Sequence, residues 1–172
     1  DGEIVKLLVD ANKQLVKLDT ASQLISNADL FISMYVRKEA LISSQIEGTQ
    51  CTLDDVLDPE VEANANLDVS DVINYVKATQ YALKRLERLP LCCRLIREIH
   101  EVLMENVRGQ DKTPGEFRHS QNWIGPANCS LKDARYIPPN VEDMQTAMSD
   151  LEKYINENVD NDTLIRTALM HY

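Results

Sequence analysis

Residues 41–55 read LISSQIEGTQCTLDD, and they place the end of one helix close to the start of another. Apolar residues up to this point follow helical spacing, and Gly48 supplies the left-handed backbone that commonly ends a helix. Thr52 and Asp55 have the spacing at which two side chains cap a first helical turn. Glu47 stands at the carbonyl end of the first helix, where the helix dipole disfavours a carboxylate by about 0.3–1 kcal/mol. We therefore expect a positive group outside this helix to meet Glu47.

The same analysis extended along the chain predicts a mainly α-helical protein. Apolar residues recur at steps of three and four, and capping residues or prolines mark the ends. Helices are expected over residues 2–22, 27–46, 52–57, 70–89, 90–109, 140–158 and 162–172. The helices at 70–89 and 90–109 are expected to pack as a hairpin.

Charge and cysteine content exclude several classes of function. The 172 residues carry a formal charge of −10, which works against binding to nucleic acid or to anionic lipid. No apolar run approaches the roughly 20 residues of a membrane span, and the acidic start lacks the basic region of a signal peptide. The four cysteines form no CxxC pair, so neither a zinc site nor a disulfide framework is indicated. We expect a cytoplasmic protein with reduced thiols.

Residues 110–130 break the helical pattern with Pro-Gly and Gly-Pro pairs and hold the only tryptophan. Long loops in compact domains are often functional. Phe117, Trp123 and Ile124 are expected to pack this loop onto the core. For Arg118 we favour a structural role as the buried partner of an acidic residue over a contact with phosphate or with a target.

Three stretches occur in a fixed order: EALISSQIEGTQ at 39–50, PGEFRHSQNWIG at 114–125 and RYIPP at 135–139. Together they resemble bacterial proteins of the Fic (Fic/DOC) family, and the resemblance spans nearly the whole chain. The Ser-x-x-x-Glu-Gly pattern of the first stretch is weak alone, because many helices match it by chance. The resemblance implies a Fic-like helical bundle with one small β-hairpin, the flap, at about 131–139.

The resemblance also implies how the chain is organised. Residues 1–60 would form an N-terminal helical region with an inhibitory helix at about 27–48. Residues 61–172 would form the N-terminal part of a Fic domain. The polar segment PEVEANANLD at 59–68 is expected to be a surface loop.

Members of this family transfer AMP from ATP to hydroxyl groups of proteins. The resemblance therefore implies a protein adenylyltransferase that uses ATP and Mg²⁺ and acts on a Ser, Thr or Tyr hydroxyl of a target protein; relatives often form homodimers. The catalytic motif of the family, His-Pro-Phe-x-[Asp/Glu]-Gly-Asn-Gly-Arg, occurs nowhere in these 172 residues. In relatives it follows a helix similar to LIRTALMHY at 164–172. We expect the chain to stop before its chemistry, to hold no catalytic residue or metal ligand, and to be inactive by itself.

The resemblance assigns an autoinhibitory role at the ATP site to Ser43, Glu47 and Gly48. In the family the inhibitory glutamate pairs with the second arginine of the absent motif, which otherwise holds the γ-phosphate of ATP. Ser43 lies one turn before Glu47, where its hydroxyl can help to hold that arginine. Ile42 and Ile46 are expected to anchor the neighbouring helix face in the core. The alternative is that Glu47 is a solvated residue at a frayed helix end.

The stretch RYIPP reads as a short strand that two prolines end. As a flap it would pair its strand edge with an extended segment of the target, and Tyr136, Ile137 and Pro138 are the candidate binding residues. An ordinary edge hairpin is an equal alternative, and Tyr136 and Ile137 could instead contact adenine.

Two interpretations of the whole chain follow. The leading one is the N-terminal part of a self-inhibited protein adenylyltransferase. The other is a non-catalytic helical interaction module or a separate inhibitory subunit. Free-standing inhibitors of the family share the helix pattern but are much shorter and lack a flap, which favours the first interpretation.

Overall fold

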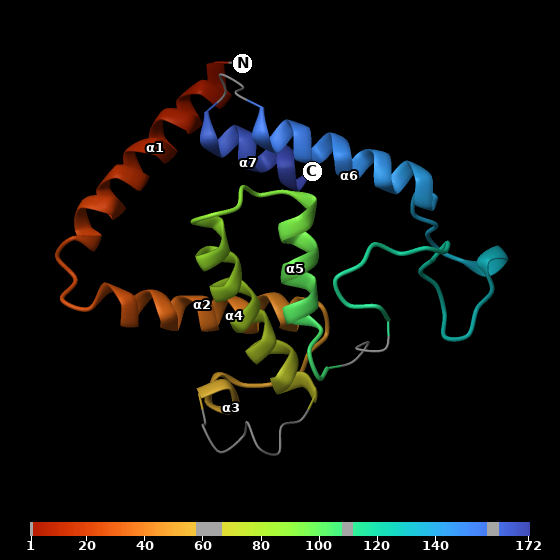
Figure 1. Cartoon of the computed structure of the whole chain (residues 1–172). Helices are drawn as coiled ribbons and strands as arrows, with labels where there is room; N and C mark the ends of the chain where they lie inside the picture. The colour runs from red at the N-terminus through yellow and green to blue at the C-terminus, as the bar shows by residue number, and fades with distance from the viewer. Residues whose placement is uncertain (1, 58–66, 108–111, 158–161) are drawn as a thin grey trace. The chain divides into compact units, whose positions relative to one another are not determined.

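The computed structural model describes residues 2–57, 67–107, 112–157 and 162–172 (Figure 1). It is mainly α-helical, as the sequence predicts. Its contacts divide the chain into two compact units, one of Asp1–Asn64 with Asp160–Tyr172 and one of Ala65–Val159. The segment expected to be a surface loop at 59–68 lies outside the described residues except for its last two positions, which begin a helix. Within the described ranges, no helix has the length and apolar character needed to cross a membrane.

The first unit contains helices whose ends are set by nearby side chains. Asn27 accepts a hydrogen bond from the Leu30 backbone N–H, and Thr52 and Asp55 form the predicted reciprocal cap. Asp162 likewise caps the last helix. The helices are α1 (Gly2–Ser22), α2 (Ala28–Ile46), α3 (Leu53–Leu57) and α7 (Thr163–His171). These four predictions are confirmed to within about one residue at each helix start.

The core of the first unit differs from the expectation. Ile42 and Ile46 of α2 are 45% and 78% exposed, whereas Ala40 and Leu41 are 0% and 7% exposed. Apolar residues occur on more than one side of this helix, so periodicity alone does not choose the face that is buried. The expectation that Ile42 and Ile46 anchor α2 in the core was therefore wrong.

The second unit is built on a pair of adjacent helices. It contains α4 (Leu67–Leu86), α5 (Cys93–Leu103), the short 3₁₀ helix η2 (Leu131–Asp133) and α6 (Val141–Asn156). The helices α4 and α5 pack side by side, as predicted, and α6 contacts α5 (Figure 1). Val72 of α4 and Leu95 of α5 are fully buried. Asn140 caps α6 through the Asp143 N–H, which was also predicted.

Both ends of α5 were predicted wrongly, since contacts with distant residues set them. The first N–H of the helix, at Cys93, donates to the Glu152 carboxylate of α6 at 2.6 Å, whereas the N-cap residue Cys92 makes no side-chain bond. At the other end, the buried Asn74 amide of α4 donates to the Leu103 carbonyl at 3.2 Å. The helix therefore begins at Cys93 rather than Pro90 and ends at Leu103. The expected glycine cap, Gly109, lies outside the described residues.

The four cysteines are unpaired thiols, as predicted. Burial is the main reason that the pKa of Cys93 rises to about 11, and its hydrogen bond with Glu152 raises it further. The same contact lowers the pKa of Glu152, chiefly because that carboxylate accepts the backbone bond. Cys93 is thus a protonated, structural thiol at neutral pH.

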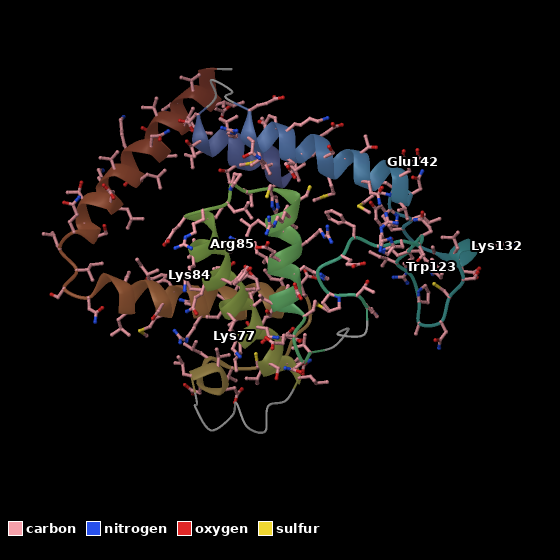
Figure 2. All side chains as sticks on the ribbon, in the orientation of Figure 1. Lys77, Lys84, Arg85, Trp123, Lys132 and Glu142 are labelled. Atoms are coloured by element: carbon pink, nitrogen blue, oxygen red, sulfur yellow. The ribbon has the colours of Figure 1, made fainter. Side chains whose placement is uncertain are left out.

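A charged cluster joins α4 to α5 at Glu98. The carboxylate accepts hydrogen bonds from Arg85 Nε at 2.7 Å, from Arg94 Nε at 2.9 Å and from the Tyr81 hydroxyl at 3.0 Å. Arg85 lies on α4 (Figure 2). Arg85, followed by Arg94, lowers the pKa of Glu98 from 4.5 to about 2.

This cluster predicts a pH dependence of stability. A lowered folded-state pKa means that the ionised Glu98 stabilises the fold above about pH 4.5, and that this stability is lost as the pH falls toward 2. We expect Glu98→Gln to lower the melting temperature at pH 7, and the difference from wild type to shrink between about pH 4.5 and pH 2. Melting curves followed by circular dichroism at several pH values measure this difference. A difference that is unchanged from pH 7 to pH 2 would exclude an ionic contribution.

Candidate functional site

The carbonyl end of α2 is closed by a compact turn. Gly48 has φ +98°, the left-handed conformation that the sequence predicts. The Thr49 N–H donates to the Ser44 carbonyl and the Gly48 N–H to the Gln45 carbonyl, each at 3.0 Å, which is the Schellman pattern of a helix end. The Gln45 amide then donates to the Cys51 carbonyl at 2.9 Å. The helix end is therefore held in place and is not frayed.

Glu47 is the residue at this helix end, directly before the left-handed glycine. Its backbone N–H is 3.1 Å from the Ser44 carbonyl, and its side chain is exposed. Within the residues that the structure describes, no lysine, arginine or histidine forms an ion pair with Glu47. The carboxylate thus stands at the negative end of a helix dipole with one side open to solvent.

The Ser43 hydroxyl lies one turn before Glu47, but it is hydrogen-bonded to Glu39, one turn earlier in the helix, and not to Glu47. It donates to Glu39 Oε1 at 2.6 Å, a short bond that is typical of a carboxylate acceptor. Sequence reasoning missed Glu39, although its spacing of four residues from Ser43 gave a signal for this contact. Ser43 therefore lies on the last turn of α2, Glu47 and Gly48 directly follow that helix, and Glu39 joins them through its bond to Ser43.

The loop after α5 is fixed to that helix at Gly115. The Gly115 N–H donates to His100 Nδ1 at 3.0 Å, and its carbonyl accepts from Arg97 Nε at 2.7 Å. Gly115 has φ +80°, and a Cβ there would lie 3.2 Å from the Glu101 Cβ.

Gly115→Ala is expected to destabilise the protein. A residue with a Cβ is strained at positive φ, and the close approach to Glu101 adds to that strain, so we expect a loss of about 1–3 kcal/mol in the free energy of unfolding. Urea denaturation measures the loss. Gly2→Ala is the matched control, because no heavy atom lies within 4 Å of a Cβ at that position. Equal effects of the two substitutions would contradict the strain.

The expected flap hairpin is reduced to one antiparallel bridge between Ile124 and Tyr136. The Ile124 N–H donates to the Tyr136 carbonyl at 2.9 Å, and the Tyr136 N–H donates back at 3.1 Å. Pro126 follows one arm and Pro138 the other, and proline has no N–H to extend the ladder. The segment 131–139 begins instead with the 3₁₀ helix η2. Within the described residues, the small β-hairpin that the sequence predicts is thus represented by this one bridge.

Side chains from the preceding loop hold the arm of the flap that contains Pro138 and Pro139. Gln121 Nε2 donates to the Pro138 carbonyl at 3.0 Å, and Arg118 donates to the carbonyls of Pro139 and Ser120. Arg118 thus holds loop backbone in place through hydrogen bonds. Its partners in the described residues are carbonyl oxygens, however, and not the acidic residue that we expected.

The flap exposes apolar side chains. The exposed fraction is 65% for Ile124, 56% for Tyr136 and 51% for Ile137. Trp123 is 40% exposed, and its indole N–H donates to the Cys129 carbonyl at 3.2 Å (Figure 2). The expectation that Trp123 and Ile124 pack onto the core was wrong, whereas Phe117 is half-buried. The flap therefore combines a short extended backbone with an apolar surface.

Metal binding finds no support in the described ranges. Those residues contain no group of three or more histidine, cysteine, aspartate or glutamate side chains that could hold a metal ion.

Two protein-family models match the chain, one in its first half and one in its second half. The model described as Fic/DOC family N-terminal matches residues 5–84, which include the whole of α2 with Ser43, Glu47 and Gly48. The model described as Fic/DOC family matches residues 90–172, which include the flap. Our boundary near residue 60 stays a prediction. Because the two matches together account for nearly the entire sequence, the chain belongs to the Fic/DOC family.

Proposed function

We propose that this chain is the regulatory and flap portion of a self-inhibited protein adenylyltransferase. The full-length protein transfers AMP from ATP to a hydroxyl of a target protein. The hydroxyl oxygen forms a bond to the α-phosphorus, the bond between the α-phosphorus and the bridging oxygen breaks, and pyrophosphate leaves. The hydroxyl proton passes to a histidine of the catalytic motif, which is not part of these 172 residues.

The observation that carries this proposal is the position of Glu47. A fixed helix end presents an exposed carboxylate that has no ion-pair partner within the described residues. A guanidinium group from the catalytic segment would pair with this carboxylate and would also be favoured by the negative end of the helix dipole, because arginine carries a fixed positive charge and is a donor at every nitrogen. An arginine bound to Glu47 is not available to the γ-phosphate of ATP. Phosphoryl transfer depends on positioning, so a nucleotide held without this arginine reacts slowly.

The flap supports the part of the proposal that concerns the target. Tyr136 is held by a single bridge, so the segment is extended without belonging to a larger sheet. An extended peptide can add to such an edge through backbone hydrogen bonds, with Tyr136 and Ile137 as apolar contacts and Pro138 as the end of the pairing. The exposed side chains of Tyr136 and Ile137 favour this role over a purely structural hairpin.

Transfer of label from ATP to protein tests the proposed reaction. The full-length protein, as wild type and as Glu47→Gly, is incubated with a target extract and with ATP labelled at either the α- or the γ-phosphate. AMP transfer leaves the α-label on protein and releases the γ-label in pyrophosphate. Label from the γ-position on protein would indicate phosphorylation instead. Absence of both labels in both proteins would refute the proposed activity.

A further inference from the structure

Three polar residues, two in α2 and one at its C-cap, follow one another at steps of four. Glu39, Ser43 and Glu47 therefore lie along one side of the helix, each about one turn from the next. The buried residues Ala40 and Leu41 belong to other positions around the helix and fix its rotation. Glu39 and Glu47 are both exposed, while Ser43 between them is half-buried.

The hydrogen bond between Ser43 and Glu39 decides what the Ser43 oxygen can still do. A serine hydroxyl has one hydrogen to donate and two lone pairs that accept. The hydrogen is committed to Glu39 Oε1 at 2.6 Å, so only the lone pairs are left. An oxygen that can only accept is matched to a guanidinium group, which can only donate.

Without Glu39, the same hydroxyl has a competing partner. Serine side chains within helices commonly donate to the backbone carbonyl four residues earlier. For Ser43 that carbonyl belongs to residue 39, and the side chain would lie against the helix backbone. The carboxylate of Glu39 therefore also selects the orientation of Ser43.

We propose that Glu39 is a positioning residue of the brake, the name used here for the inhibitory pair Ser43 and Glu47. Glu39 holds the Ser43 hydroxyl as a pure hydrogen-bond acceptor for the arginine that Glu47 binds. This inference rests on the proposed function, and it adds a third residue to the pair that the sequence pattern contains. Glu39 acts through Ser43, because two helical turns, about 12 Å, separate it from Glu47.

Two substitutions at residue 39 separate hydrogen bonding from charge. Glu39→Met keeps the length of the side chain and removes the strong acceptor, whereas Glu39→Gln removes the charge and keeps a carbonyl oxygen that accepts. Both residues have high helix propensity, so α2 is retained. In the full-length protein, the affinities for ATP and AMP are measured by titration calorimetry. We expect Glu39→Met to raise the affinity for ATP about two- to tenfold, the range for one ordinary hydrogen bond, with AMP unchanged.

A double-mutant cycle shows whether Glu39 acts through Ser43. The effect of Glu39→Met should vanish in a Ser43→Ala background, because the hydroxyl that it positions is gone. Glu39→Gln should stay close to wild type. Glu142→Met is the matched control, since Glu142 is an exposed carboxylate on α6, and it should leave both affinities unchanged (Figure 2). Melting curves show whether each variant is folded.

Three results would overturn this role. Glu39→Met could leave ATP affinity unchanged while Glu47→Gly raises it; the brake would then stand without Glu39. Equal effects of the Met and Gln variants would assign the change to charge. A full effect of Glu39→Met in the Ser43→Ala background would show that Ser43 is not involved. If Glu47→Gly itself has no effect on ATP affinity, the proposed function fails, and the role of Glu39 fails with it.

Discussion

Replacing Glu47 with glycine in the full-length protein is expected to raise the rate of AMP transfer about ten- to hundredfold. This range corresponds to one hydrogen-bonded charge pair, about 1.5–3 kcal/mol. The arginine released from Glu47 becomes available to the γ-phosphate, so the α-phosphate is presented in line with the attacking hydroxyl. Incorporation of α-labelled ATP into protein, measured as an initial rate, gives the change directly.

The chain offers a closely matched control for this substitution. Glu87 is also exposed and also follows the last residue of a helix, because α4 ends at Leu86. Glu87→Gly should leave the rate unchanged. Glu47→Gln, which keeps the side-chain length and loses the charge, should give an intermediate rate. Equal rates for Glu47→Gly and wild type would exclude Glu47 as the brake.

The second large effect is expected at the flap. In the Glu47→Gly background, Ile137→Glu should lower AMP transfer to the target more than tenfold and leave ATP affinity unchanged. Ile137 is 51% exposed, so a carboxylate is tolerated in the free protein, but it would have to be desolvated beneath a bound peptide. Target labelling and ATP titration on the same preparation separate the two effects.

Leu83 provides the control for a charge placed on an exposed apolar residue. It lies on α4 and is 59% exposed. Leu83→Glu should leave target labelling at the level of its Glu47→Gly parent. A loss of ATP affinity in Ile137→Glu would favour the other interpretation, in which Ile137 contacts adenine. If Ile137→Glu lowers neither target labelling nor ATP affinity, the flap is an ordinary structural hairpin without a binding role.

The helix ends that the sequence predicted well are those with a local cause. Asn27, the pair of Thr52 and Asp55, Gly48 and Asn140 each act on backbone groups within a few residues of themselves. Such caps depend on spacing alone, so one sequence is enough to find them. The end of α2, on which the candidate site depends, belongs to this class.

The ends of α5 show where local reasoning fails. Glu152 caps the start of this helix from a distance of 59 residues along the chain, and Asn74 satisfies its last turn from the preceding helix. No periodicity encodes a contact of that kind. Proline at residue 90 and glycine at residue 109 were plausible local signals, but tertiary contacts set the boundaries.

The candidate site was predicted in part for the same physical reason. Ser43 within α2, Glu47 at its C-cap and Gly48 in the left-handed turn have the expected positions, since these follow from spacing. The direction of the Ser43 hydrogen bond did not follow, because a hydroxyl can turn toward either neighbour on the helix. The flap was overestimated as a hairpin, because its prolines limit pairing to a single bridge.

The affinity of the full-length protein for ATP relative to AMP, in wild type and in Glu47→Gly, tests the central claim most directly. If the Glu47 carboxylate takes the place of the γ-phosphate on an arginine, the substitution acts only on a nucleotide that has a γ-phosphate. Titration calorimetry should then show a tighter ATP complex and an unchanged AMP complex. Equal gains for both nucleotides, or no gain for ATP, would contradict the account.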